Sequence, residues 1–287
     1  MQYEKYGLIC QIFYVRQNKQ GKELMEEQKK DEIRQEVRKR YTDITKSDSA
    51  GCGCSPSCCI LQDPSIKDLS AKLGYTPQEI DSVPDGANMG LGCGNPQAIA
   101  MLKEGETVLD IGCGGGFDCF LAAKQVRDKG HVIGVDMTPE MISKARENAQ
   151  KGNYTNVEFR LGEIEYLPVA DNAVDVIISN CVINLSPDKS QVFREAYRVL
   201  KPGGRLAISD IVAIQKLPEV MKNDVEKYTG CIAGAATVNE LKTILERTGF
   251  VNIHIKLKEE SRNFIKDWFP GSGAEEFVMS AFIQAQK

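Results

Sequence analysis

Apolar and polar residues alternate along the second half of the chain in two different patterns. From Thr107 onward, short apolar runs read TVLDIG, HVIGVD, NVEFRLG, VDVIISN and RLAISDI. The segments between them include FDCFLAAKQV, PEMISKARENAQ and KSQVFREAYRVL, whose apolar residues have helical spacing. Nearly continuous apolar strands that alternate with amphipathic helices predict an α/β fold, in which helices cover both faces of a parallel sheet.

The last part of the chain follows a different order. After RLAISDI comes an irregular stretch, residues 212–236, and then the helical pattern TVNELKTILERTGF. Two final strand patterns, VNIHIKL and EFVMSAFIQA, complete the chain. They predict an antiparallel edge on an otherwise parallel sheet.

The first part of the chain predicts a strongly charged helix. It reads MEEQKKDEIRQEVRKRY and begins near Met25. Its apolar residues Ile33, Val37 and Tyr41 recur every four positions, which indicates one narrow docking stripe. Residues 1–24 do not fit this pattern, so we expect Met25 to be the true start and residues 1–24 to be an extension without a role.

Between the charged helix and the first strand, the pattern changes twice. Residues 47–65 form a Ser-, Gly-, Pro- and Cys-rich loop, and the helical segment IKDLSAKLG follows. A Gly-rich turn, ANMGLGCGNP, precedes a helix that starts near Pro96. These changes predict a helical, Cys-rich N-terminal region over residues 25–95 and the sheet domain over residues 96–287, with residues 212–236 as an insertion.

Composition and charge exclude two classes of partner. The formal net charge is −4, so nothing suggests the basic surface of a nucleic-acid-binding protein. No apolar run approaches the roughly 18 residues that a membrane span needs. The apolar stretch at the N-terminus is short, is interrupted by Gln11 and precedes no small-residue cleavage site. We therefore expect a cytoplasmic protein without a nucleic-acid or membrane partner.

The ten cysteines point to thiol chemistry, because a reducing cytosol does not favour a structural disulfide framework. Four of them crowd one loop with the spacing C-x-C-x3-C-C: Cys52, Cys54, Cys58 and Cys59. Zinc usually takes two separated pairs of ligands, so we favour a mobile segment that captures a soft ion or forms a redox disulfide, with zinc as the alternative. Cys113 and Cys119 are expected to be packing residues, and Cys10 belongs to the N-terminal extension.

The strongest local motif is VLDIGCGGGFD, residues 108–118. Its glycines follow a strand and precede a helix, where small residues let the backbone approach a ligand closely. Such glycines also occur in dinucleotide-binding proteins, but Asp110 lies inside the motif, where a carboxylate can face a cationic amino-acid group. The second strand ends at Asp136, which can accept both hydroxyls of a ribose. The third strand ends in GEIE, which places Glu163 and Ile164 where an adenine ring would lie.

In order and spacing, these segments resemble class I S-adenosylmethionine-dependent methyltransferases over roughly residues 90–287. The resemblance implies a Rossmann-like sheet and S-adenosylmethionine as the cofactor. The residues expected to contact this cofactor are Asp110, Gly112, Gly114, Asp136, Met137, Glu163, Ile164 and Asn180. The alternative is that the glycines only form a tight turn and that Asp136 only caps the next helix.

Further segments resemble arsenite methyltransferases closely, from about Met25 to the end of the chain. They read GLGCGNP, GVDMTPEM, GEIE, NCVINLSPDK and GCIAGA. The resemblance implies that thiolates of Cys93, Cys181 and Cys231 hold arsenic(III), with no other metal in the site. It also implies that an upstream cysteine takes part in a redox step. Four cysteines of the 47–65 loop are candidates for that step, and the Gly-Cys context favours the first two, Cys52 and Cys54.

The implied chemistry agrees with the residues. Trivalent arsenic is a soft centre, so thiolates outcompete oxygen ligands. Its lone pair carries no proton, so the attack on a sulfonium methyl needs no general base, and His131 and His254 lie in predicted strands outside the site. Methyl transfer formally oxidises arsenic. The resemblance therefore implies a thiol reductant of the thioredoxin or glutathione type, and a role in arsenic detoxification.

Two other functions stay open at the level of the sequence. A methyltransferase acting on a carbon or oxygen of a small metabolite would share every cofactor motif, and Cys93 and Cys231 would be dispensable in it. A thiol-rich arsenic- or metal-sequestering protein would bind the ion without turning over the cofactor. The intact Asp110, Asp136 and Glu163 argue against the second possibility.

Overall fold

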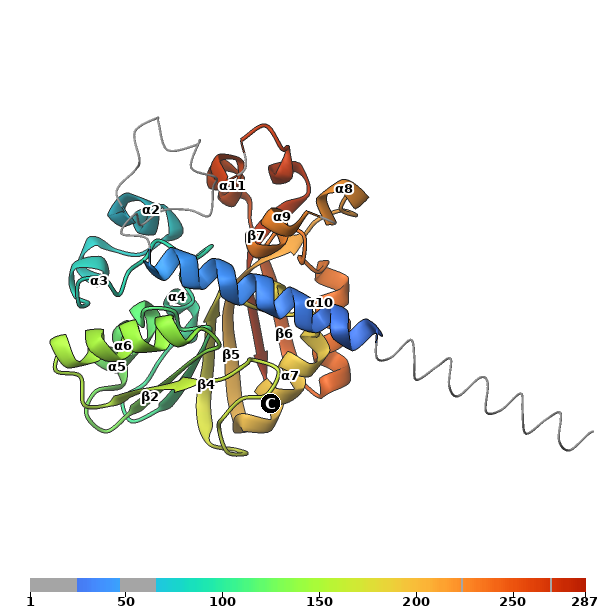
Figure 1. The fold of residues 1–287 in the computed structure, drawn as a ribbon. Helices are drawn as coiled ribbons and strands as arrows, with labels where there is room; N and C mark the ends of the chain where they lie inside the picture. The colour runs from blue at the N-terminus through green and yellow to red at the C-terminus, as the bar shows by residue number, and fades with distance from the viewer. Residues whose placement is uncertain (1–24, 47–65, 223, 269) are drawn as a thin grey trace, which may run out of the picture.

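Seven strands form one sheet in the computed structural model, which describes residues 25–46, 66–222, 224–268 and 270–287 (Figure 1). The strands are β1 (Thr107–Ile111), β2 (His131–Asp136), β3 (Val157–Leu161), β4 (Val174–Asn180), β5 (Leu200–Ala213), β6 (Val251–Lys258) and β7 (Val278–Gln286). Their order across the sheet is β3-β2-β1-β4-β5-β7-β6. The predicted extension and the 47–65 loop, with the five cysteines they contain, lie outside the described residues.

The pairing confirms a parallel sheet with an antiparallel edge. Strand β1 pairs in parallel with β2 and β4, which places Leu109 opposite Ile133 and Ile177. Strand β7 pairs antiparallel with β5 and β6, which places Ile283 opposite Ile208 and Ile255. The carboxyl ends of the parallel strands therefore meet at one edge of the sheet, where open α/β sheets bind their ligands.

Helices cover both faces of the sheet, as the sequence predicts. The four longest helices that follow β1 are α5 (Phe117–Val126), α6 (Pro139–Lys151), α7 (Lys189–Val199) and α10 (Val238–Thr248). Successive residues of a strand point to opposite faces. Accordingly, Val108 packs with residues of α5 and α6, whereas Leu109 packs with residues of α7 and α10.

Short helices complete the molecule. They are α2 (Ile66–Leu73), α3 (Pro77–Asp81), α4 (Gln97–Ala100), α8 (Glu219–Lys222), α9 (Val225–Thr229) and α11 (Arg262–Trp268), with the 3-10 helices η2 (Ile183–Leu185), η3 (Glu259–Ser261) and η4 (Ala274–Glu276). The predicted helix near Pro96 is only one turn, because Met101 turns the backbone into the left-handed region at φ 48°. The stretch 212–236 is less irregular than predicted, since it holds α8 and α9.

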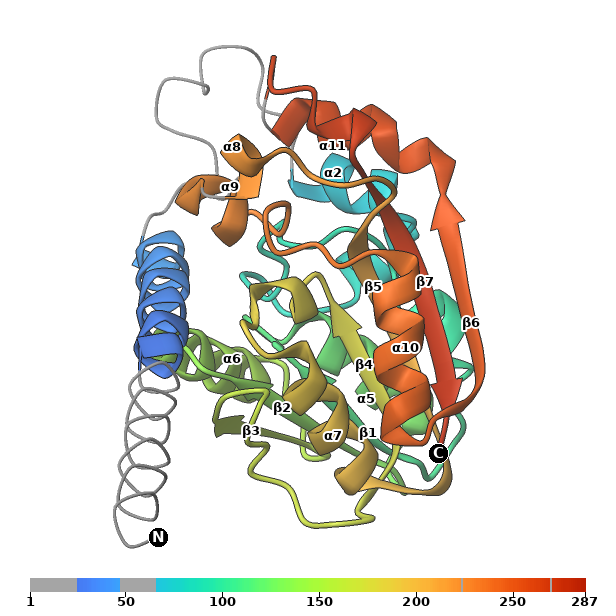
Figure 2. The ribbon, with the colours of Figure 1, turned by 90° about the vertical axis from the view of Figure 1, so that its right-hand side faces the viewer.

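Residues 25–46 are helical, and we call them the N-terminal helix. The predicted docking stripe is confirmed, because Val37 is 1% exposed and Ile33 and Tyr41 pack against the same apolar cluster. On the side of α6, the Thr42 hydroxyl donates to the Glu140 carboxylate at 3.1 Å. Figure 2 shows the helix standing along one side of the molecule.

None of the helices in the described part of the chain has the length and apolar character needed to cross a bilayer.

Candidate active site

The glycine loop between β1 and α5 needs its glycines. Gly112 has a φ of 76°, and a Cβ at this position would lie 2.3 Å from Val182. Gly116 has a φ of 93°, and a Cβ there would lie 2.8 Å from the ring of Phe120. A side chain at either position would be both strained and overlapped, so the loop keeps a bare backbone at the end of β1.

A cavity opens beside this loop at the carboxyl ends of β1, β2 and β4. Its wall includes all but one of the residues expected to contact the cofactor: Asp110, Gly112, Gly114, Asp136, Met137, Ile164 and Asn180. The N-terminal helix forms another part of the wall, through residues that include Val37 and Tyr41. A segment that lies far from the glycine motif in the sequence therefore contributes to the cavity wall.

Three buried carboxyl groups, those of Asp110, Asp118 and Asp136, line this cavity. Burial and the neighbouring Asp118 raise the pKa of Asp110 well above its usual value, and burial raises the pKa of Asp118 to about 6. Burial also raises the pKa of Asp136, although backbone N–H groups of Thr138, Gly114 and Met137 stabilise its charged form. Negative charges held close together out of water favour a cationic ligand, which would relieve their mutual repulsion.

Asp136 is held in one orientation at the end of β2. Its Oδ1 accepts the N–H of Thr138 at 2.9 Å, and its Oδ2 accepts the N–H of Gly114 at 3.0 Å. Each carboxylate oxygen has a further lone pair, so both can still accept hydroxyl groups. This donor and acceptor pattern fits S-adenosylmethionine, which combines ribose hydroxyls with positive charge.

The structure brings Cys93, Cys181 and Cys231 together, and we call these residues the thiol cluster. All three are buried. The sulfurs of Cys93 and Cys181 and a carboxylate oxygen of Asp210 lie within 4.8 Å of one another. Cys231 Sγ donates to the carbonyl oxygen of Cys181 at 2.9 Å, and both residues also line the cavity. The cluster therefore combines a turn before the sheet, the residue after β4 and the segment after α9.

Two members of the thiol cluster have an unusual backbone. Cys181 and Cys231 have φ values of 60° and 63°, in the left-handed region that favours glycine. Backbone hydrogen bonds hold this conformation. The N–H of Cys181 donates to the carbonyl oxygen of Ser209 at 2.8 Å, and the N–H of Cys231 donates to the carbonyl oxygen of Tyr228 at 3.0 Å. Strained backbone of this kind concentrates at functional sites, where the surrounding structure maintains it.

Two thiols of the cluster, those of Cys181 and Cys231, have a raised pKa and so hold their protons more tightly than an ordinary cysteine. Interactions with Cys231 and Cys93, together with burial, raise the pKa of Cys181 well above its usual value. A hydrogen bond with Cys181 lowers the pKa of Cys231, but burial and the nearby Asp210 outweigh it, so that pKa is also raised. A ligand of the cluster must therefore displace or accept thiol protons as it binds.

Two residues close to the thiol cluster, Asp210 and Tyr41, are absent from the site residues that the sequence predicts. Asp210 is buried on β5, and burial raises its pKa to about 6 although N–H groups of Ile183 and Ile211 donate to it. Tyr41 lines the same cavity as Cys181 and Cys231, and burial together with these two cysteines raises its pKa. The sequence signal for Asp210 is its position in the strand RLAISDI, one residue after Ser209. Tyr41 was predicted only as part of the apolar docking stripe of the N-terminal helix.

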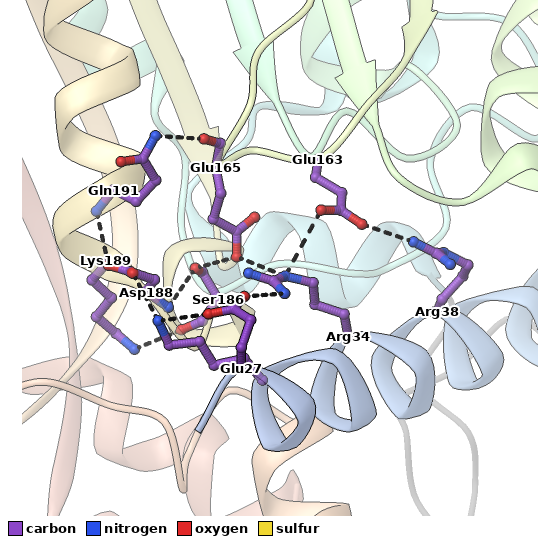
Figure 3. Close-up of polar contacts among 10 residues, drawn as sticks. Glu27, Arg34, Arg38, Glu163, Glu165, Ser186, Asp188, Lys189 and Gln191 are labelled. Carbon is purple, nitrogen blue, oxygen red and sulfur yellow. Dashed lines mark hydrogen bonds and ion pairs between the residues drawn. The ribbon is translucent and has the colours of Figure 1, made fainter. Parts of the chain in front are cut away.

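Glu163, the remaining predicted cofactor residue, does not line the cavity. It accepts a hydrogen bond from Arg38 at 3.1 Å, on the side of the N-terminal helix (Figure 3). Glu165 lines the cavity instead, and it accepts hydrogen bonds from Ser186 at 2.6 Å and from Arg34 at 3.5 Å. The two glutamates of GEIE thus hold the N-terminal helix, while Ile164 between them faces the cavity. The sequence offered one signal for these ion pairs: Arg34 and Arg38 are four residues apart and therefore lie on the same face of the N-terminal helix.

The other singled-out residues lie at the margins of the site. Cys119 and Cys113 are buried in the apolar cluster beneath α5, where Cys119 Sγ donates to Asp110 at 3.2 Å, and Cys113 also reaches the cavity wall. His131 contacts Glu158 at 3.2 Å, and His254 lies on the edge strand β6. Neither histidine lines the cavity.

Comparison with known proteins places this geometry in a family. Residues 102–249 match a family profile described as a methyltransferase domain. The chain is 52% identical to an arsenite methyltransferase of Halobacterium salinarum over 90% of its own length and 67% of that protein. It is 39% identical to the human arsenite methyltransferase, over 55% of this chain and 44% of the human protein. The chain thus spans two thirds of the archaeal relative and less than half of the human one.

Two solved structures of methyltransferases are similar to this chain. An arsenic(III) S-adenosylmethionine methyltransferase from Chlamydomonas reinhardtii is 34% identical, with a TM-score of 0.57 over 78% of this chain and 74% of that chain. A Haemonchus contortus phosphoethanolamine N-methyltransferase in complex with S-adenosyl-L-methionine is 23% identical, with a TM-score of 0.57 over 78% of this chain and 60% of that chain. The second likeness establishes the fold alone.

Proposed function

The chain belongs to the arsenite methyltransferases of the class I methyltransferase superfamily, and we propose that it transfers the methyl group of S-adenosylmethionine to trivalent arsenic bound by Cys93, Cys181 and Cys231. One observation carries the proposal: three buried thiols from distant segments meet beside the cavity. A methyltransferase for a small metabolite has no need of such a cluster.

The thiol cluster binds arsenite by exchange. Arsenous acid carries three hydroxyl groups, and each of the three thiols can replace one of them. As an arsenic–sulfur bond forms, the thiol proton leaves with the displaced hydroxyl as water, so three thiols release three waters. The raised pKa values of Cys181 and Cys231 keep these protons on the sulfurs until arsenite arrives. Soft sulfur ligands then hold soft arsenic in preference to oxygen.

The cavity residues hold the methyl donor next to the cluster. We propose that Asp136 accepts the ribose hydroxyls, that Asp110 faces the cationic methionine end and that Ile164 contacts the adenine. S-adenosylmethionine supplies an electrophilic methyl group on a positively charged sulfur. The arsenic lone pair attacks this methyl without giving up a proton, so no residue has to act as a base. The contribution of the protein is to fix the two reactants in one site.

Reduction completes the proposed cycle. Arsenic formally loses two electrons when it gains the methyl group, and two cysteine sulfurs can return them by forming a disulfide. We propose that the loop cysteines at positions 52, 54, 58 and 59 take part in this step or capture arsenite first. A cytoplasmic reductant of the thioredoxin or glutathione type would then restore the thiols, in a pathway of arsenic detoxification.

Serine substitutions in the thiol cluster test the proposal. We expect Cys181→Ser and Cys231→Ser to lower methylation of arsenite and methylarsenite at least about 100-fold, because a hydroxyl is a poor arsenic ligand. Cys93→Ser should be as damaging with arsenite but milder with methylarsenite, in which a methyl group already occupies one arsenic valence. The measurement is turnover with labelled S-adenosylmethionine and a thiol, followed by arsenic speciation.

Cys119→Ser is the matched control, since this buried thiol lies outside the cluster and a serine hydroxyl can still donate to Asp110. Full activity of the Cys181 and Cys231 variants would sink the arsenic proposal in favour of a small-metabolite methyltransferase. Binding of arsenite without any methylated product from the unmodified protein would support a sequestering protein instead.

A further inference from the structure

The turn that carries Cys93 is docked on one side chain of the sheet. Asn180, the last residue of β4, accepts the N–H of Cys93 through Oδ1 at 3.0 Å and donates through Nδ2 to the carbonyl oxygen of Gly94 at 2.7 Å. Gly92 packs directly on the same amide, since a Cβ there would lie 2.9 Å from Nδ2. Asn180 thus contacts Cys93 and both of its neighbours in the turn, Gly92 and Gly94.

A buried polar chain fixes the orientation of Asn180. Its Nδ2 also donates to the hydroxyl of Tyr75 at 3.0 Å and approaches the carboxylate of Asp118 at 3.4 Å. The Tyr75 hydroxyl donates in turn to both oxygens of Asp118, at 2.9 and 3.0 Å. These acceptors all surround the nitrogen of the amide, so its oxygen must face Cys93. The amide cannot flip without losing bonds on both ends.

Cys93 depends on such a tether more than the other two cysteines do. Cys181 directly follows β4, and the Cys231 thiol donates to the Cys181 carbonyl, so these two hold each other. Cys93 reaches the cluster from a turn that lies 87 residues before Asn180 in the sequence. Two other hydrogen bonds hold Cys93 in the structure. Its sulfur donates to the carbonyl oxygen of Ser209 at 3.5 Å, and the hydroxyl of Ser280 donates to its carbonyl oxygen at 2.7 Å.

We propose that Tyr75, acting through Asp118 and Asn180, positions Cys93 as the third arsenic ligand and so determines how well the site accepts arsenite relative to methylarsenite. This inference rests on the proposed function. Arsenite has three exchangeable valences and uses all three thiols, whereas methylarsenite has two and needs only Cys181 and Cys231. Tyr75 is a positioning residue, since it does not line the cavity.

The test is Tyr75→Phe, which removes one hydroxyl and keeps the ring that packs against Phe117 at 4.8 Å. We expect arsenite methylation to fall about tenfold, the size of one lost hydrogen bond to a charged group, while methylarsenite methylation stays within about twofold. Arsenite binding without cofactor should weaken by the same factor. The single tryptophan, Trp268, lines the cavity and reports binding by fluorescence quenching.

Two controls separate positioning from a general loss of structure. Tyr154→Phe removes a hydroxyl from another ring that packs on a phenylalanine, Phe120, away from the cavity wall, and should change neither substrate. In a Cys93→Ser background, Tyr75→Phe should have no further effect on arsenite, because the residue it positions is gone. If Tyr75→Phe fails to fold, Asp118→Asn interrupts the same chain, and because Asp118 also lines the cavity this variant is compared only by arsenite binding without cofactor.

Equal losses on arsenite and methylarsenite, or a full additional loss in the Cys93→Ser background, would overturn the inference. So would unchanged arsenite affinity in Tyr75→Phe and Asp118→Asn. The proposed function fails by a different result, in which the unmodified protein methylates neither substrate. The binding measurement still decides the role of Tyr75 in that case, because it involves no methyl transfer.

Discussion

Single residues in this site serve the fold and the ligand at once. Asp136 ties the glycine loop to the end of β2 through the N–H of Gly114, and it presents the same carboxylate to the cavity. Asn180, expected from the sequence to bind the cofactor, lines the cavity while its amide holds the turn of Cys93. A substitution at such a position therefore changes binding through the ligand and through the loop.

Asp136→Ala should weaken S-adenosylmethionine binding by roughly 10- to 100-fold. The alanine variant loses two hydrogen bonds to a charged acceptor, each worth about 1.5–3 kcal/mol. It also no longer has to bury a carboxylate, and this gain offsets part of the loss. Asp136→Asn keeps one carbonyl acceptor, so its affinity for S-adenosylmethionine should lie between those of the unmodified protein and Asp136→Ala. Calorimetric titration measures all three, with the exposed Asp128→Ala as the control. Unchanged affinity in Asp136→Ala would remove this residue from the site.

At the scale of elements, the N-terminal helix belongs to the active site although its sequence is mostly charged. It docks by Val37 and by ion pairs to both glutamates of GEIE (Figure 3). Arg34 and Glu165 are 9% and 3% exposed, so this pair is removed from water. Removing one partner of a buried pair leaves an uncompensated charge, which costs about 3–5 kcal/mol if the charge stays buried.

Arg34→Met should therefore loosen the helix from the cavity and raise the dissociation constant for S-adenosylmethionine at least about tenfold. The double variant Arg34→Met/Glu165→Gln should recover part of the loss, because it removes the unpaired charge. Lys30→Met is the matched control on the same helix, since its pair with Asp188 at 3.1 Å is partly exposed and is worth about 1 kcal/mol or less. Equal effects of Arg34→Met and Lys30→Met would contradict a special role for the buried pair.

At the scale of the whole molecule, one edge of the sheet collects the cavity and the thiol cluster, to which the proposed function assigns the two reactants. The carboxyl ends of β1 and β2 line the cavity, and the thiol cluster comes from the turn before the sheet, the residue after β4 and the segment after α9. The overall charge of −4 does not reveal this arrangement, because it is the buried carboxylates that set the local field. Cofactor binding should therefore depend on pH through these buried groups.

S-adenosylmethionine affinity should fall as the pH is lowered through about 6. Burial raises the pKa of Asp118 to about 6, so this carboxyl takes up a proton below that pH and the cavity loses negative charge. For a single coupled proton the affinity changes at most about tenfold per pH unit. Titrations between pH 5 and 8 measure the effect, and S-adenosylhomocysteine, which lacks the sulfonium charge, should show a smaller change. A rise in S-adenosylmethionine affinity toward low pH would refute the negative cavity.

The pattern of hydrophobic residues along the sequence was sufficient to predict the α/β architecture. Strand and helix bounds such as Phe117–Val126 agree with the structure, because the periodicity of apolar residues is a local property that burial enforces in any fold of this class. Motif spacing likewise indicated Asp110 and Asp136, which line the cavity, because loops at strand ends keep their place relative to the strands. The resemblance to arsenite methyltransferases, not the spacing, implied the set of three cysteines. The helix predicted near Pro96 is confirmed, but its length of one turn could not be predicted because the left-handed Met101 that ends it leaves no clear mark in the sequence.

Only the tertiary structure shows which side chains face one another. GEIE has no periodicity that tells Glu163 from Ile164, and it is the docking of Arg34 and Arg38 that turns the glutamate away from the cavity. The chain from Tyr75 through Asp118 to Asn180 joins residues more than forty positions apart, so no local pattern contains it. Contacts between distant segments depend on packing in three dimensions, which spacing along the chain does not specify.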